Sequence, residues 1–112
     1  MQWTLAPAKG AAPAGPGGSI AIQATADIEA GWYIYAMTQA AGGPYALVIA
    51  LPPSEMFSLG GVIQAPLTRR KFDENFKMET ETHADRVTFA IPVRIAKAAR
   101  PGAHTLQLSV TY

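Results

Sequence analysis

The stretch "RVTFAIPVRI", from Arg86 to Ile95, is the clearest strand in the chain. Most of its residues are β-branched or aromatic, and a turn at Ala84 and Asp85 precedes it. Pro92 lies inside the stretch and cannot donate a hydrogen bond to a neighbouring strand, which predicts a sheet edge or a bulge at that point. This segment therefore predicts a protein built from β-sheet.

Shorter segments with strand character lie on both sides of this stretch. We expect strands at 2–5, 20–25, 32–37, 46–51, within 54–66 as a pair or one bulged strand, at 77–82, and from 103 to the last residue. In the last of these, Leu106, Leu108 and Val110 alternate with polar residues, the period-2 pattern of a half-buried strand. No segment has helical periodicity. The prediction is an all-β fold, an immunoglobulin-like antiparallel β-sandwich of about seven to nine strands, with a small closed barrel as the second architecture.

Length and composition predict one domain and exclude several classes of function. The 112 residues fit a single domain, 1–112, with a Pro/Gly-rich loop at 7–18. The net charge is +1, and the only basic cluster is at 69–71, so we expect no nucleic-acid partner. The longest apolar run, 46–51, is far shorter than the roughly 20 residues that span a bilayer. There is no cysteine, so the chain can build neither a disulfide nor a thiolate metal site.

Histidines and carboxylates offer only weak candidate sites. His83 and His104 have no metal-ligand spacing, and we expect both in solvent or in turns. Glu79 and Glu81 lie two apart on an expected strand, which places both on one solvent face. The acidic pair at 73–74 lies in a loop between Phe72 and Phe76, and exposed aromatic residues on a loop suggest a contact surface.

The densest aromatic cluster is "GWYIY", residues 31–35. In a strand, Trp32 and Ile34 share one face while Tyr33 and Tyr35 share the other. One face is expected in the core, and the other either packs on the sheet or lines a site with two hydroxyl groups. No nucleophile elbow, phosphate-binding loop, dinucleotide fingerprint or zinc-protease motif is present.

Four stretches together resemble one family. They are "WTLAPA", "IEAGWYIYAM", "DENF" followed by "ADRVTFAIPVRI", and "GAHTLQLSVTY", in the order and spacing of the N-terminal periplasmic domain of the thiol:disulfide interchange protein DsbD. "GWYIY" is similar to that family's G-W/Y-H/Y-I/L-Y strand, and "VTY" resembles the start of its final V-x-Y-Q-x-C stretch. The resemblance covers nearly the whole chain.

The resemblance implies a function in periplasmic electron transfer. Domains of this family carry a cysteine pair that receives reducing equivalents from the membrane-embedded part of the same protein. They pass these to thioredoxin-fold partners in disulfide isomerisation and cytochrome c biogenesis. For this chain it implies a periplasmic location, a parent anchored in the inner membrane with a further C-terminal domain, no cofactor, no metal and no small-molecule substrate.

The resemblance also implies a site. Asp73, Glu74 and Phe76 match a cap loop that shields the cysteines, with Asn75 inserted between the acids and the aromatic residue and Phe72 as the other aromatic candidate. Tyr33, Tyr35 and Tyr112 match positions lining the cysteine site. A loop that excludes water slows attack on a disulfide, and nearby carboxylates disfavour a thiolate.

In the family, the first cysteine follows shortly after the residues that match Thr111 and Tyr112. We therefore expect a chain cut before its cysteine pair, redox-inactive by itself, from a parent that is a protein-disulfide reductase. Two alternatives stay open. One is a non-redox extracytoplasmic interaction module that uses the sandwich to present loops. The other is a copper-binding sandwich that uses His83 or His104 with methionines at 37, 56 or 78.

Overall fold

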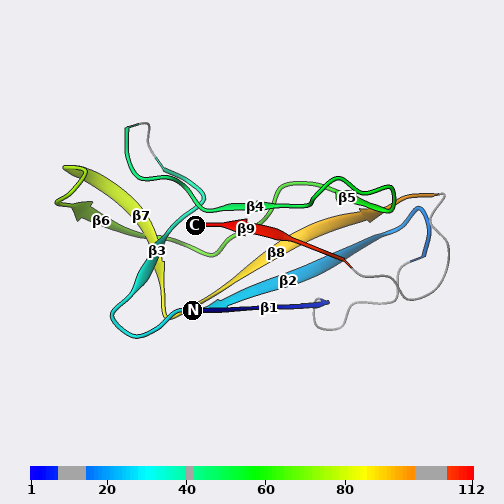
Figure 1. Ribbon diagram of the computed structural model, residues 1–112, viewed down its shortest axis with the longest axis horizontal. Coiled ribbons are helices and arrows are strands. Elements are labelled where there is room, and N and C mark those ends of the chain that lie inside the picture. Colours follow the sequence, from blue (N-terminus) through cyan, green and yellow to red (C-terminus); the bar gives the residue numbers. More distant parts are fainter. Residues whose placement is uncertain (8–14, 40–41, 98–105) are drawn as a thin grey trace.

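Strands make up the regular structure of the protein. The computed structural model describes residues 1–7, 15–39, 42–97 and 106–112, and within these ranges there is no helix (Figure 1). The nine strands are β1 (Gln2–Pro7), β2 (Ser19–Asp27), β3 (Tyr33–Tyr35), β4 (Val48–Ala50), β5 (Phe57–Leu59), β6 (Arg69–Asp73), β7 (Met78–Ala84), β8 (Arg86–Ile95) and β9 (Ser109–Thr111). With no helix in the described ranges, none there is long and apolar enough to cross a membrane.

The strands form three antiparallel sheets. Their orders are β1-β2-β8-β5, β3-β7-β6 and β4-β9. β4 and β9 run along the length of the four-stranded sheet, while β6 and β7 extend from one end of the molecule (Figure 1). The sheets do not close on themselves, so the fold is the expected immunoglobulin-like sandwich and not the barrel.

The core is centred on the pairing of β2 with β8. The two strands are in register over nine residue pairs, from Ser19 opposite Arg94 to Asp27 opposite Arg86. Inward positions alternate with outward ones on both strands, as the pleat requires. Two of the inward side chains of β2 are small, Ala24 and Ala26, and the third is Ile22. The inward side chains of β8 are larger than alanine throughout: Val87, Phe89, Ile91 and Val93.

The opposite layer is contributed by short strands and their flanks. Ile34 of β3, Ile49 of β4 and the adjacent Leu47 are buried in the same cluster. Half-buried residues of the last segment pack against it, namely Leu106, Leu108 and Val110. This confirms the alternation predicted for 106–110, although the regular strand there covers only Ser109–Thr111.

Pro92 does not lie on an edge. β8 is a central strand between β2 and β5, and its register with β2 continues through Ala21 opposite Pro92. The Pro92 carbonyl accepts a hydrogen bond from Gly60 N at 2.9 Å. In an antiparallel strand the N–H and C=O groups of one residue point to the same side, so the position at which Pro92 lacks an N–H faces Gly60 and not β2. β5 has already ended at Leu59 there. The edge that was predicted here is wrong. The alternative, a bulge, is present but in the partner of β8: residues 60–63 lie opposite 91 and 92, between the pairs Leu59–Val93 and Gln64–Ala90.

Several boundaries differ from the expected ones. The aromatic strand is limited to Tyr33–Tyr35, and the strand at 46–51 is limited to Val48–Ala50. The strand expected at 77–82 begins at Met78 because Lys77 has a positive φ of 52° and closes the preceding turn. Residues 8–14 of the loop at 7–18, and the start of the strand expected from 103, lie outside the described residues.

We predict that Phe89→Ala destabilises the domain strongly. Phe89 is fully buried, and its loss leaves a cavity between the layers, so the free energy of unfolding should fall by roughly 3–5 kcal/mol. Phe72→Ala is the matched control, because Phe72 of β6 is 53% exposed and its loss should cost under about 1 kcal/mol. Urea denaturation followed by tryptophan fluorescence measures both values. Equal losses would contradict this placement of the core.

Candidate functional site

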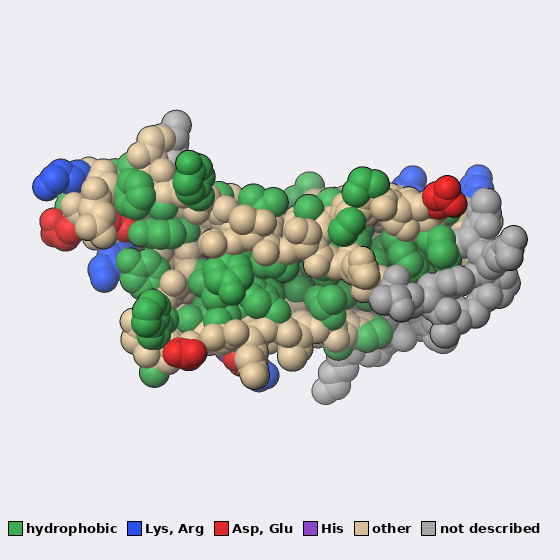
Figure 2. Space-filling model, viewed as in Figure 1, with side chains coloured by type: hydrophobic (Ala, Val, Ile, Leu, Met, Phe, Trp, Pro, Cys, Tyr) green, Lys and Arg blue, Asp and Glu red, His purple; other side chains and the backbone are tan. Residues whose placement is uncertain are grey.

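Residues of β3 and of the turn after β6 meet at the end of the molecule formed by β3, β6 and β7. β7 pairs with β3 on one side and with β6 on the other, which holds the two strands near each other. The Tyr35 hydroxyl donates a hydrogen bond to Asp73 Oδ2 at 2.7 Å, across 38 positions of sequence. Hydrophobic side chains are exposed at this end beside charged ones (Figure 2).

The turn after β6 is organised by the Asp73 carboxylate. Its Oδ1 accepts hydrogen bonds from Asn75 N at 2.8 Å and from Phe76 N at 3.2 Å. The Asp73 carbonyl accepts a further hydrogen bond from Lys77 N at 2.7 Å. An aspartate that caps its own turn in this way is a common local signal. Asp73 is buried, and both of its carboxylate oxygens accept hydrogen bonds from within the protein.

These hydrogen bonds polarise the pair. The hydroxyl of Tyr35, followed by the backbone N–H groups of Phe76 and Asn75, lowers the pKa of Asp73, against the opposing effect of burial. In turn, the hydrogen bond to Asp73 and then burial raise the pKa of Tyr35. At neutral pH the pair is therefore a carboxylate held by a protonated phenol.

Aromatic rings extend the cluster on both sides of Tyr35. The ring of Tyr33 lies edge-on to it at 5.6 Å between centroids, and the ring of Phe76 lies edge-on at 6.3 Å. Lys71 Nζ lies 5.9 Å from the centroid of Tyr33. Edge-on contacts of this kind hold rings in place. The turn at 73–76 is thus joined to β3 by one hydrogen bond and one ring contact, and the ring in contact is Phe76.

The structure separates the remaining residues of the predicted site. Glu74 is exposed on the turn. Tyr112 is outside the Tyr35–Asp73 cluster: its ring lies 6.2 Å from Trp3, and it lines a hollow of about 410 Å³ together with Tyr33. Trp32 also lines this hollow and is 69% exposed, so the prediction that one face of "GWYIY" is core holds for Ile34 but not for Trp32. Trp32 precedes the strand, where the pleat no longer decides which way it faces.

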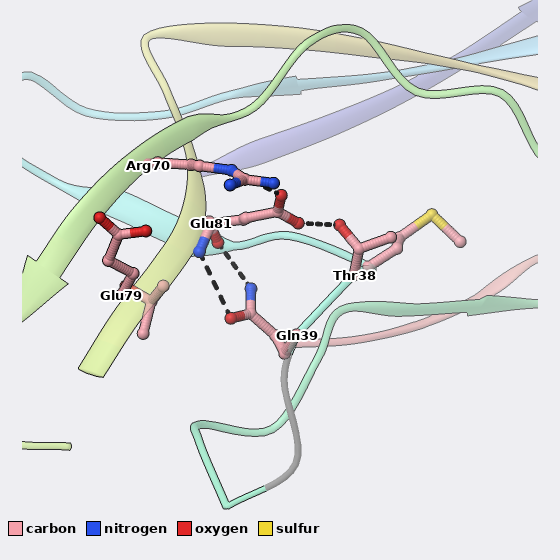
Figure 3. A pocket seen from close by; sticks show the side chains of 7 residues that line it. Thr38, Gln39, Arg70, Glu79 and Glu81 are labelled. Atoms are coloured by element: carbon pink, nitrogen blue, oxygen red, sulfur yellow. Dashed lines mark hydrogen bonds and ion pairs between the residues drawn. The ribbon is translucent and has the colours of Figure 1, made fainter. Parts of the chain in front are cut away.

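A second hollow, of about 470 Å³, was not predicted from the sequence. It is lined by Met37, Thr38, Gln39, Arg70, Glu79, Thr80 and Glu81 (Figure 3). Glu79 and Glu81 share this face, as their spacing predicted. No motif pointed to Thr38 or Gln39, because they become neighbours of β7 only when β3 pairs with it.

The carboxylate of Glu81 is fully engaged in this hollow. Thr38 donates a hydrogen bond to it, and Arg70 Nε lies 3.5 Å from it. The Thr38 hydroxyl first and the Arg70 charge next lower the pKa of Glu81, against the effect of burial. Glu79 lies apart from this network (Figure 3). An ionised, hydrogen-bonded carboxylate is a poor general acid or base at neutral pH.

His83 is buried rather than solvated. It lies on β7 with only 4% of its surface exposed, and its ring is edge-on to Phe89 at 5.5 Å. Its Nε2 has no hydrogen-bond partner among the described residues. Burial lowers the pKa of His83, although the negative charge of Glu81 opposes this shift. The sequence-based expectation of a solvated or turn histidine was wrong because β7 has one face toward the core.

The copper alternative has little support from this arrangement. His104 lies outside the described residues. Within the described ranges, no three His, Asp or Glu residues are grouped so that they could hold a metal ion.

The fold and the cluster define a class: an immunoglobulin-like sandwich domain that closes a short acidic turn over two tyrosines at one end. Over residues 3–112 the sequence matches the family described as "Thiol:disulfide interchange protein DsbD, N-terminal". The chain therefore belongs to the DsbD N-terminal domain family, as the resemblance predicted. No curated protein and no solved structure matched the chain. Domains of this family are extracytoplasmic and act with thioredoxin-like proteins.

We predict that Tyr35→Phe raises the pKa of Asp73 toward its ordinary value, because the main hydrogen bond that favours the carboxylate is lost. A lowered pKa stabilises the fold above the ordinary aspartate pKa, and this contribution disappears as the pH falls through the lowered value. The variant should lose part of it. Carboxyl carbon NMR titration measures the pKa, with Tyr33→Phe as the control. An unchanged Asp73 pKa in Tyr35→Phe would contradict the assignment.

We predict that His83 makes the domain less stable as the pH falls below about 6.5. Its pKa is lowered in the folded state, so the unfolded chain takes up the proton first and stability declines. In His83→Leu, the loss of stability between about pH 7.5 and about pH 5.5 should be smaller than in the unchanged chain. Thr80→Val, which alters another buried polar residue of β7, should keep the original pH dependence. Urea denaturation at both pH values measures these free energies of unfolding, and an equal loss in His83→Leu and the unchanged chain would contradict the prediction.

Proposed function

We propose that this chain forms the frame of a periplasmic thiol-exchange domain. Its parent would carry reducing equivalents from a membrane-embedded domain to thioredoxin-fold partners in disulfide isomerisation and cytochrome c biogenesis. The family match over residues 3–112 supports the class of reaction. The observation that carries the proposal is the turn at 73–76, which places Phe76 against Tyr35.

In the proposal, Asp73, Glu74 and Phe76 form the cap of the site, and Tyr33, Tyr35 and Tyr112 line it. Disulfide exchange needs a thiolate that reaches a disulfide sulfur. Phe76 in its position against Tyr35 would cover sulfur atoms lying below it, and the ionised Asp73 would disfavour a thiolate nearby. The cap therefore has to move when a partner docks. Movement of Phe76 away from β3 would break its ring contact with Tyr35.

The sulfur atoms must come from outside this sequence, which contains no cysteine. We place the cysteine pair in the parent shortly beyond the residues Thr111 and Tyr112. Two features support this placement: the family pattern, and the hollow that Tyr112 shares with Tyr33 of the cluster. The next ten or so codons of the parent gene test it directly. A Gln-x-Cys followed closely by a second Cys is the expected reading, and continuation without cysteines would contradict the redox function.

A non-redox interaction module remains the second candidate. The observation in its favour is the exposed aromatic surface around the hollow, where Trp32 is 69% and Tyr112 is 66% exposed. The same gene sequence separates the two functions. In the absence of a thiol pair in the parent, this surface would be the site to test with partner binding.

We predict that Phe76→Ala, made in the cysteine-bearing domain, speeds the reduction of its disulfide by a small thiol. Removal of the ring opens a path to the sulfur atoms, and we expect an increase of roughly tenfold in rate. Stopped-flow measurement with dithiothreitol gives this rate. Phe72→Ala is the matched control, since Phe72 is also an exposed phenylalanine but has no ring contact with Tyr35 among the described residues. Equal rates for both variants would show that Phe76 is not the cap.

A further inference from the structure

The outer edge of β1 is the least protected strand edge in the described part of the chain. β1 is the first strand of the four-stranded sheet, and among the nine strands it pairs only with β2 (Figure 1). It is six residues long, and its register with β2 runs without a bulge from Gln2 opposite Asp27 to Pro7 opposite Ile22. A long flat edge of this kind presents unpaired backbone N–H and C=O groups to any extended chain.

The other edges carry the devices that prevent such pairing. β6 has five residues and is similarly exposed, but three of them are cationic: Arg69, Arg70 and Lys71. β5, β3, β4 and β9 have only three residues each, and β5 ends at two glycines. β1, "QWTLAP", has no charged residue, and its proline is the last one. Among the strands of the described ranges, β1 is therefore the one whose edge has neither a charge nor a very short length to prevent pairing.

We propose that β1 pairs with β1 of a second copy of this chain, antiparallel and about a two-fold axis at Thr4, so that two four-stranded sheets join into one of eight strands. The occupant is a second copy because the strand is complementary to itself in this register. Gln2 then lies opposite Ala6 of the second copy, Trp3 opposite Leu5, and Thr4 opposite Thr4. The proposal does not depend on the proposed redox function.

The inward face of β1 favours this register. Trp3 is partly buried and stacks on Phe89 at 6.0 Å, so it faces the core layer. Leu5, two residues further on, shares that face but is 46% exposed. Residues directly opposite one another in an antiparallel pair share a face. The axis at Thr4 therefore covers each exposed Leu5 with a Trp3, on the apolar side of the joined sheet.

The outward face favours the same register. Thr4 lies opposite Thr25 of β2, and Thr25 lies opposite Thr88 of β8. The hydroxyl oxygens of Thr25 and Thr88 are 3.0 Å apart and hydrogen-bonded. An axis at Thr4 extends this row of threonines across the junction into the second copy, and cross-strand threonine pairs are favourable. An axis at Trp3 would pair only three residues, and one at Leu5 would bring Pro7 into the ladder.

Single cysteines test this register, because the chain has none of its own. In Thr4→Cys the two thiols lie directly opposite, where Cα atoms are about 4.5–5.5 Å apart, within the range that a disulfide spans. Mild oxidation should link most of this variant as a dimer. Ala6→Cys is the matched control: Ala6 is on the same face and exposed, but it faces Gln2 of the second copy. Equal cross-linking of both variants, or none of Thr4→Cys, would overturn the proposal.

Charged substitutions at Thr4 provide a second measurement, made on the full 112-residue chain. Sedimentation velocity from about 1 µM to about 1 mM should show dimer formation at the upper end, as expected for a small interface. Thr4→Lys should weaken it roughly tenfold because two like charges meet at the axis. An equimolar mixture of Thr4→Lys and Thr4→Glu should restore the dimer.

Ser58→Lys, on the exposed β5 edge of the same sheet, should leave the dimer unchanged. Circular dichroism checks that each variant is folded. If the unchanged chain stays monomeric at every concentration, the proposal is overturned. The edge of β1 would then be interpreted as a site for pairing with an extended segment of another protein. A mixture that fails to restore the dimer would overturn the axis at Thr4.

Discussion

The pairing of β2 with β8 is the constraint on which the rest of the structure depends. Nine consecutive residue pairs place small alanines of β2 beside the large side chains of β8. One face of this pair of strands therefore defines the core. A shift of one residue would turn Phe89 and Ile91 to solvent. The neighbouring strands β1 and β5 are positioned by this ladder, and β3, β4 and β9 supply the layer that covers it.

The candidate site is positioned by β7, the strand that directly precedes β8 in the chain. β7 packs one face toward the core through His83 and carries β3 and β6 on its two sides. Tyr35 and Asp73 are far apart in sequence but meet because both strands are held by this one strand. The site is therefore built from one end of the sandwich, away from the glycine-rich end of β5, and its hydrogen bonds are made within the domain.

Local sequence patterns predicted which segments are strands better than they predicted where each strand ends or which strands it packs against. The β-branched and aromatic residues of Arg86–Ile95 predicted β8 to the residue, and the turn at Asp85, with a positive φ of 63°, lies where the sequence placed it. The sheet edge predicted at Pro92 was wrong because the sequence of a strand does not show which of its two neighbouring strands is interrupted. His83 and Trp32 were misjudged for the same reason: burial depends on the strand that packs opposite, which no local pattern encodes. The rings of Tyr33 and Phe76 lie against Tyr35, a contact that no local pattern encodes. Thr38 and Gln39 had no signal in the sequence.

The side chain of Gln39 marks the point at which the chain leaves the sheet after β3. Its amide adds to the backbone pairing of β7. Nε2 donates to the carbonyl of Glu81 at 2.6 Å, which also accepts from Ala36 N at 2.8 Å, and Oε1 accepts from the Glu81 N–H at 3.4 Å. The backbone of β7 is therefore satisfied at this position without a strand residue. The pairing of this segment with β7 therefore ends at a side chain and not at a further strand residue.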